Sequence, residues 1–340
     1  MLIGGPQHLE ASKDEDWLSS ILKRVTTKIV VVGVGGAGNN TVTRLMNDNV
    51  KNVATVAVNT DAQDLFYCKA HKKLLIGKKL TGGLGAGNDP EIGEAAAIES
   101  EEEIKEILRG ADLVFVTCGL GGGTGTGAAP IVAEISKKLG ALTVSICTLP
   151  FRAEGKKRIK NALGGLQKIV NVSDTFIPVP NDKLLEVAGN ASIFEAFRLA
   201  DGILINGVKG ITEMLTTPGL VNIDFADLKT VLSRRGYALI GIGEGEGEQR
   251  ALKAIRNAIN SPLIDIDIKN AKSALINVTG NRNLKLKEAE MAVDAISRSM
   301  NSDAEIIWGA IISQHIKQTA LRVTLVVAGI ELYDYEAKFE

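Results

Sequence analysis

A loop rich in glycine and threonine constrains this chain more than any other feature of its sequence. It lies between an apolar run, 113–116, and a segment expected to be helical from Pro130, and it reads Gly121, Gly122, Gly123, Thr124, Gly125, Thr126, Gly127. Glycines let backbone N–H groups approach an anion closely, threonine hydroxyls add donors, and a following helix points its N-terminal N–H groups at the same place. A flexible linker would not be held between a buried strand and a helix. We therefore predict a phosphate-binding loop.

Two more glycine-rich loops occur earlier in the chain. The first, 33–38, follows the apolar run 28–32 and precedes a helix expected from Asn39. Together with Asp61 after the next strand, it fits the Gly-x-Gly-x-x-Gly pattern of a dinucleotide site. The other loop, 82–88, adds a third glycine cluster, and three such loops favour one long polyphosphate over two nucleosides. The chain has no Gly-x-x-x-x-Gly-Lys-Ser/Thr sequence, which excludes a P-loop NTPase.

Composition and charge exclude several classes of protein. The net charge is -1 with a pI near 6.4, and no basic stripe is interleaved with aromatic residues, so nucleic acid is not an expected partner. The three cysteines are separate and are expected to be core residues in a reducing cytoplasm, while the three histidines form no metal-ligand cluster. No apolar run reaches the length of a membrane span, so direct membrane insertion is not expected. These features predict a cytoplasmic protein.

The hydropathy pattern predicts an α/β fold with two domains. Strands and helices alternate from residue 28 to about 180, which is typical of a mainly parallel sheet with ligands at the carboxyl ends of its strands. An apolar stretch over 192–216 predicts a buried connecting helix, and a smaller α/β domain follows. The acidic, glycine-rich stretch 243–247 is expected to be a surface turn. The expected units are an N-terminal extension with a short amphipathic helix (1–27), a nucleotide domain (28–191), the helix (192–217), a C-terminal domain (218–332) and a tail (333–340).

Several short blocks together resemble the tubulin family, and within it the FtsZ branch. Besides the glycine–threonine loop, these blocks are residues 36–40, 59–62, 148–151, 154–158 and 222–227. The resemblance implies a Rossmann-like GTP-binding domain, a central helix, and a C-terminal domain that activates hydrolysis of GTP to GDP with Mg²⁺ bound through the phosphates. It also implies head-to-tail protofilaments of the cell-division ring at mid-cell, with division-ring and membrane-anchoring proteins as partners.

The resemblance assigns nucleotide contacts to individual residues. Thr126 would donate a hydrogen bond to phosphate, Glu154 and Arg158 would contact ribose and phosphates, and Phe197 would stack on the base. Asn40, Asn181 and Asp201 would read guanine and ribose, since a carboxylate can accept two N–H groups that adenine does not offer. The full expected set is Gly36, Ala37, Gly38, Asn39, Asn40, Asp61, Ala86, Gly87, Gly121, Gly122, Gly123, Thr124, Gly125, Thr126, Gly127, Thr148, Pro150, Glu154, Arg158, Asn181, Phe197 and Asp201.

The resemblance also implies a catalytic group, formed by Asn222, Asp224 and Asp227. From the residues alone, Asp224 is equally well explained as the N-cap of a helix over 225–232. If the group is catalytic, the connecting helix places it roughly 30 Å from the phosphate loops, at 1.5 Å per residue. A second copy of the chain must then complete the site, and head-to-tail stacking that does not close forms a filament. The two aspartates would orient and polarise the attacking water.

Two other functions remain open at this point. An NAD(P)-dependent oxidoreductase would explain the first glycine loop and Asp61, although not the glycine–threonine loop or the acids at 222–227. A nucleotide-binding scaffold without turnover would keep every binding motif, and only a phosphate-release measurement would separate it from a GTPase.

Overall fold

The computed structural model describes residues 27–48, 50, 52–183, 193–217, 219–234, 236–261 and 268–330. Within these ranges, the side chains of residues 193–201, 203 and 204 are not described. The expected amphipathic helix over 14–24 and the tail 333–340 lie outside the described residues. None of the described helices is long and apolar enough to cross a membrane.

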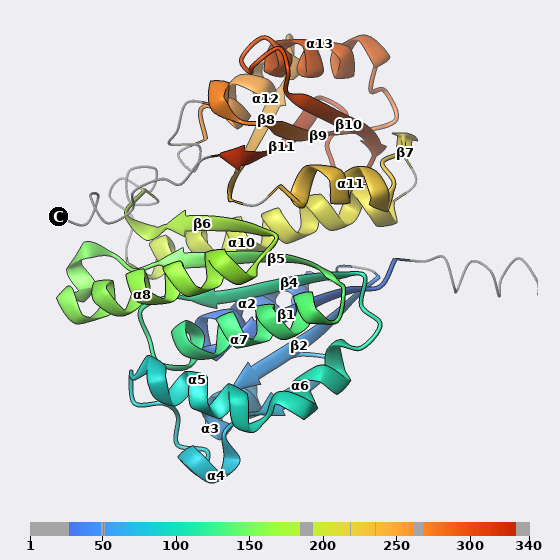
Figure 1. Cartoon of the computed structure of the whole chain (residues 1–340). Coiled ribbons are helices and arrows are strands. Elements are labelled where there is room, and N and C mark those ends of the chain that lie inside the picture. Colours follow the sequence, from blue (N-terminus) through green and yellow to red (C-terminus); the bar gives the residue numbers. More distant parts are fainter. Residues whose placement is uncertain are drawn as a thin grey trace, which may run out of the picture.

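Six parallel strands form the sheet of the N-terminal half, in the order β3-β2-β1-β4-β5-β6 (Figure 1). Each inner strand is buried on both faces, as its run of apolar residues predicts. The alternating pattern of the sequence therefore gave the correct class of fold. The strands are β1 (Ile29–Val34), β2 (Val53–Asn59), β3 (Lys72–Leu75), β4 (Leu113–Gly119), β5 (Leu142–Leu149) and β6 (Thr175–Pro180).

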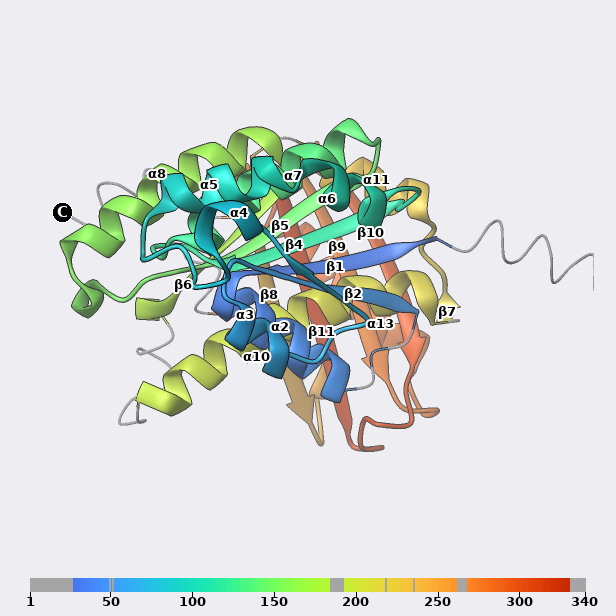
Figure 2. The same cartoon turned by 90° about the horizontal axis from the view of Figure 1, so that it is seen from below.

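Helices cover both faces of this sheet. As Figure 2 shows, α5, α6, α7 and α8 lie on one face, whereas α2 and α10 lie on the other. The expected start of α7 was wrong: the helix begins at Thr124, and Pro130 lies inside it. The helices are α2 (Gly35–Asn47), α3 (Ala62–Tyr67), α4 (Lys78–Thr81), α5 (Pro90–Glu99), α6 (Glu101–Leu108), α7 (Thr124–Lys138), the 3₁₀ turn η1 (Arg152–Glu154), α8 (Lys156–Val172) and α10 (Ile193–Thr216).

The C-terminal half continues the same sheet from β6 through β8-β11-β9-β10-β7. Here β11 runs antiparallel to β8 and β9, whereas β9 and β10 are parallel. The two halves meet where Phe176 pairs with Tyr237, and these rings stack edge to face at 5.8 Å. The elements are β7 (Gly219–Val221), α11 (Phe225–Leu232), β8 (Tyr237–Glu246), α12 (Arg250–Ile259), η2 (Ile268–Asn270), β9 (Ser273–Gly280), α13 (Leu286–Ser297), β10 (Glu305–Ile312) and β11 (Ala320–Ile330).

Helix α10 confirms the predicted buried connection and spans 24 residues. Its buried side chains join a hydrophobic cluster that contains residues of both halves, including Ile146 and Leu275. The buried members from α10 are Ile205, Val208, Ile211 and Met214. One helix therefore packs into both halves and connects them through a shared hydrophobic cluster.

The expected surface turn at 243–247 is wrong, because most of this stretch belongs to β8. A Cβ at Gly243 would lie 2.0 Å from the Ala254 carbonyl oxygen, and one at Gly245 would lie 2.0 Å from the Arg250 carbonyl oxygen. The glycines therefore let the backbone of α12 pack directly against the strand. Glycine next to glutamate indicated a turn, although here it marks close packing of a helix on a strand.

A buried ion pair ties α12 to α13 in the C-terminal half. The Arg250 guanidinium donates from Nε to one Glu288 oxygen at 2.7 Å and from Nη2 to the other at 2.9 Å. Its Nη1 also donates to the Gln318 carbonyl, on the loop before β11. This guanidinium holds the pKa of the Glu288 carboxyl below its usual value. Since Arg250 is only 7% exposed, it depends on the carboxylate to balance its charge.

We expect Glu288→Gln to lower the free energy of unfolding by about 2–3 kcal/mol at neutral pH, because it leaves a buried guanidinium without a counter-charge. Urea unfolding followed by circular dichroism measures this difference. The pKa of Glu288 is depressed in the folded chain, so its stabilisation is present above the unfolded glutamate pKa and is lost as the pH falls through the folded value. The difference in free energy of unfolding between wild type and variant should therefore become smaller at acidic pH. A gap that is constant over this range would contradict the ion-pair explanation.

Candidate functional site

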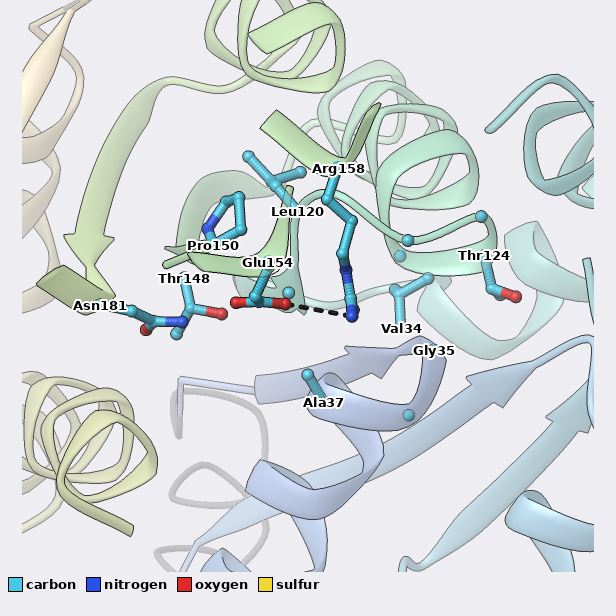
Figure 3. A pocket seen from close by; sticks show the side chains of 15 residues that line it. Val34, Gly35, Ala37, Leu120, Thr124, Thr148, Pro150, Glu154, Arg158 and Asn181 are labelled. Carbon is cyan, nitrogen blue, oxygen red and sulfur yellow. Dashed lines mark ion pairs between the residues drawn. The ribbon is translucent and has the colours of Figure 1, made fainter. Parts of the chain in front are cut away.

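A cavity of about 260 Å³ opens at the carboxyl ends of β1, β4 and β5 (Figure 3). Its walls come from the N-terminal turns of α2 and α7, the segment after β5, the start of α8, and the residue that follows β6. This is the edge at which parallel α/β sheets bind ligands. The lining residues are Val34, Gly35, Gly36, Ala37, Gly119, Leu120, Gly122, Gly123, Thr124, Gly125, Thr148, Pro150, Glu154, Arg158 and Asn181.

Two helices begin at this cavity without a side-chain cap. The residues before them, Val34 for α2 and Gly123 for α7, make no capping hydrogen bond, and neither helix has an acidic residue in its first turn. The first N–H groups of a helix need acceptors, and the helix dipole favours negative charge at this end. The two helix starts therefore offer free donors to an anion held between them.

Glycines allow these two helix starts to meet. Gly35 has a φ of +71°, and a Cβ there would lie 2.9 Å from the Gly125 nitrogen. A Cβ at Gly38 would lie 2.4 Å from the Thr117 carbonyl oxygen, so α2 also rests directly on β4. Side chains at these positions would push α2 away from α7 and β4. The glycine pattern is thus needed to shape the floor of the cavity.

One ion pair lies on the wall of the cavity. Arg158 Nη1 is 3.0 Å from Glu154 Oε2, and the other Glu154 oxygen accepts the Phe151 N–H at 2.8 Å. Figure 3 shows both side chains reaching over the cavity. The lining contains no lysine, so the Arg158 guanidinium is the positive side chain available there. It can meet an anion with parallel N–H donors.

One unpartnered amide group lies in the cavity wall, and a second lies behind it. Asn181 is 4% exposed, and its side-chain oxygen has no hydrogen-bond partner although the residue lines the cavity. Asn39, the fifth residue of α2, lies behind the lining; it is 1% exposed, and neither of its side-chain amide atoms has a partner. A buried amide without a partner is costly unless a ligand supplies one. Polar groups of a ligand would therefore be stabilised on this side.

Several residues expected in the site lie behind its wall. Thr126 is buried, and its hydroxyl accepts the Gly121 N–H at 2.8 Å, so it holds the loop closed from beneath. Asp61 caps α3 by accepting the N–H groups of Gln63 and Asp64. Ala86 supports the loop from outside, since a Cβ at Gly123 would meet it at 2.8 Å. The expected residues that do not line the cavity are Gly38, Asn39, Asn40, Asp61, Ala86, Gly87, Gly121, Thr126 and Gly127.

The other differences between the expected site residues and the residues that line the cavity have simple causes. Sequence analysis missed Val34, Gly35, Gly119 and Leu120, which line the cavity. All four lie at the junction of a strand with its glycine loop, so continuing each loop back to the end of its strand would have found them. The side chains of Phe197 and Asp201, on α10, lie outside the described part of the chain, and their assignments stay predictions.

The three expected catalytic residues lie at the other end of α10, beside β7 and α11 (Figure 1). Asp224 caps α11 by accepting the Asp227 N–H at 2.7 Å, and Asp227 in turn accepts the Asp224 N–H at 3.2 Å. Asn222 accepts the Gly219 N–H at 2.7 Å. The capping interpretation is therefore confirmed for the single chain. These bonds are made at the surface, so the carboxylates are also open to a second molecule.

Comparisons with known proteins identify the family. Residues 28–189 match the model of the tubulin/FtsZ family GTPase domain, and residues 236–331 match the FtsZ family C-terminal domain. The cell division protein FtsZ 1 of Pyrococcus abyssi is 54% identical over 96% of this chain and 87% of its own length. The cell division protein FtsZ of Methanothermobacter thermautotrophicus is 55% identical over 92% of this chain and 82% of its own length.

A solved structure agrees with these matches. The empty FtsZ dimer of M. jannaschii superimposes with a TM-score of 0.89 at 52% identity, covering 94% of this chain and 93% of that one. The fold and its cavity are thus those of a tubulin-superfamily GTPase. Within that superfamily, the chain belongs to the FtsZ family.

We expect Gly35→Ala to weaken binding of both GTP and GDP by at least about tenfold, or about 1.4 kcal/mol, because the added methyl group separates the two helix starts. Isothermal titration calorimetry measures both affinities. Gly140→Ala is the matched control, since Gly140 also has a positive φ, of +89°, but a Cβ there meets nothing within 4 Å. Equal losses in the two variants would show that backbone strain, rather than closure of the cavity, is responsible.

Proposed function

We propose that this chain is a cell-division GTPase whose active site is completed by a second copy bound head to tail. The observation that carries the proposal is that the cavity and the group of carboxylates lie at opposite ends of α10. A cavity with free helix N-termini lies at one end of α10, and exposed carboxylates lie at the other. Its relatives are named cell division proteins, and one solved relative is an FtsZ dimer.

GTP fits the cavity with its phosphates at the starts of α2 and α7. There the uncapped N–H groups and Arg158 replace the lysine that P-loop enzymes use. The unpartnered Asn181 oxygen would accept a hydrogen bond from the base or ribose. Asp201 and Phe197, on the first half of α10, would read guanine and stack on it.

Hydrolysis needs a group that orients water at the terminal phosphate. The cavity wall offers no free carboxylate for this, because Glu154 is bound to Arg158 and to the Phe151 N–H. Asp224 and Asp227 of a second copy would supply it, with Asn222 beside them. Acceptance of a water proton by a positioned carboxylate is general-base catalysis, which contributes about 10²–10⁴-fold to a rate.

Mg²⁺ is the metal expected with a bound triphosphate. The described residues contain no group of three His, Cys, Asp or Glu side chains that could hold a metal ion. Mg²⁺ keeps several waters in protein sites and binds mainly through substrate phosphates. When bound, the ion would neutralise charge that develops on the phosphates, and Thr148 offers a hydroxyl oxygen in the cavity lining.

Head-to-tail contacts of this kind repeat without closing, so they build a protofilament. We propose that such filaments act in the cytoplasm at the mid-cell division ring, with division-ring and membrane-anchoring proteins as partners. The family match to a GTPase domain leaves no support for an oxidoreductase. It also disfavours a scaffold without turnover.

Asp227→Asn should lower phosphate release per polymerised subunit by about 10²-fold while GTP affinity stays unchanged. The amide oxygen still accepts the Asp224 N–H, so the variant keeps the helix cap and loses only the charge. Filaments should persist longer, because the nucleotide at each contact stays intact. A malachite-green phosphate assay with a pelleting control measures both effects.

Asp303→Asn serves as the control, because it removes an exposed charge elsewhere in the C-terminal half. Wild-type turnover in Asp227→Asn would remove this residue from the catalytic group.

Phosphate release per subunit should be almost absent at low protein concentration and rise sharply above a threshold. A site made from two chains forms only when they associate, so mass action on the contact controls turnover. Light scattering in excess GTP and Mg²⁺ should rise at the same threshold. Constant activity per subunit over a broad dilution series, without scattering, would mean that one chain holds the whole site.

A further inference from the structure

A short hydrogen bond joins two threonine side chains beside the cavity. The hydroxyl oxygen of Thr60, which directly follows β2, lies 2.6 Å from the hydroxyl oxygen of Thr124, the first residue of α7. Thr60 is fully buried, whereas Thr124 is half-buried and lines the cavity. The bond therefore connects a side chain of the cavity lining with one that a ligand does not reach.

The burial of Thr60 decides the direction of this hydrogen bond. Its hydroxyl is closed off from water, so the hydroxyl proton needs an acceptor within the protein, and leaving it without one is costly. Within the described part of the chain, the Thr124 hydroxyl oxygen is the one partner of the Thr60 hydroxyl. Thr60 is therefore the donor and Thr124 the acceptor. The proton of the Thr124 hydroxyl then stays free, on a side chain that lines the cavity.

Neighbouring groups fix the position of Thr60. The Asn59 side-chain oxygen accepts the Thr60 N–H at 2.9 Å, and the Asn59 side-chain nitrogen donates to Asp64 Oδ2, on α3, at 2.6 Å. The Thr60 carbonyl in turn accepts the Gly85 N–H at 3.2 Å. The loop after β2 and the third glycine loop both hold Thr60 in place, so its hydroxyl meets the start of α7 at one defined point.

Thr124 lies at the end of the cavity that is remote from Asn181. Figure 3 shows these two residues on opposite sides, with Glu154 and Arg158 between them in this view. The proposed function places the base and ribose at Asn181, so the phosphates extend toward Thr124. GTP differs from GDP in its terminal phosphate, which is the part farthest from the nucleoside. The Thr124 hydroxyl is therefore placed to donate a hydrogen bond to that phosphate.

We propose that Thr60 is a positioning residue that makes the cavity prefer GTP to GDP. Its hydroxyl keeps the Thr124 oxygen occupied as an acceptor, which directs the Thr124 proton toward the terminal phosphate. A hydroxyl that accepts one hydrogen bond also donates more strongly, because the two bonds polarise each other. This role rests on the proposed binding of GTP and adds to it a residue that touches no ligand itself.

Nucleotide competition tests this role. Displacement of the fluorescent analogue mant-GDP by GTP and by GDP is measured at a protein concentration that gives no light scattering, so that assembly does not contribute. The variant Thr60→Val keeps the shape of the side chain and removes its hydroxyl. We expect this variant to bind GTP about fivefold more weakly, the effect of one lost hydrogen bond, while its affinity for GDP changes less than about twofold.

Two matched variants separate positioning from a general loss of structure. Thr60→Ser keeps the hydroxyl donor and should retain the wild-type ratio of GTP affinity to GDP affinity. Thr143→Val removes a hydroxyl from another buried pair, in which Ser136 Oγ lies 2.8 Å from Thr143 Oγ1. That pair lies at the start of β5, whereas the cavity opens at the opposite end of this strand. Thr143→Val should therefore leave the affinity ratio unchanged.

A double variant tests whether the two threonines act as one unit. Thr124→Val should lower the ratio of GTP affinity to GDP affinity at least as much as Thr60→Val does. Adding Thr60→Val to Thr124→Val should lower the ratio no further, because the hydroxyl that Thr60 positions is already absent. Additive losses would show that the two residues act independently and would overturn the inference.

The other outcomes separate this role from the proposed function. GDP binding by each variant shows that it is folded. An unchanged affinity ratio in Thr60→Val, or equal losses for GTP and GDP, would overturn the role of Thr60 and leave the proposed GTPase mechanism standing. Absence of phosphate release by the wild-type chain would contradict that mechanism instead, whereas the affinity ratio would still decide the role of Thr60.

Discussion

The contact between the N-terminal turns of α2 and α7 is the constraint on which the rest of this structure depends. Both helices start at the same sheet edge, and only glycine at position 35 lets them approach this closely. Neither start is capped, so the chain leaves several N–H groups without acceptors. Such an arrangement is unfavourable in isolation and becomes stable when an anion is bound. The fold is therefore built around a ligand that the chain itself does not contain.

The second constraint is the burial of α10. It packs in one cluster with residues of both halves, and the chain places the cavity and the exposed carboxylates at 222–227 at opposite ends of this 24-residue helix. An enzyme that needs both groups has to obtain one of them from a neighbour. In the proposed mechanism, assembly controls hydrolysis, because the contact that extends a filament would also complete a site. In the single chain, the same carboxylates cap α11, and these hydrogen bonds fix their position.

The local pattern predicted most of the fold and part of the site. Buried strands, the long connecting helix and the glycine loops could be recognised because each depends on neighbours in sequence. The lining residues Glu154, Arg158 and Asn181 came from the resemblance to a family, since an i, i+4 ion pair is by itself a common surface feature. The stretch 243–247 was misjudged because the packing of α12 against β8 depends on a helix that follows the strand.

The sequence by itself determined the parallel sheet, the three glycine loops and the absence of a phosphate-binding lysine, because these follow from residue type and spacing. Only the tertiary structure decided which loop residues line the cavity. Thr126 belongs to the same loop as Thr124, and Ala86 belongs to another of the glycine loops. Both lie behind the cavity wall and support it from there. Whether a side chain points inward depends on how two helices pack across a sheet, and that packing involves residues far apart in the chain. The placement of the cavity and the carboxylates at opposite ends of α10 likewise depends on the packing of this helix into both halves of the chain.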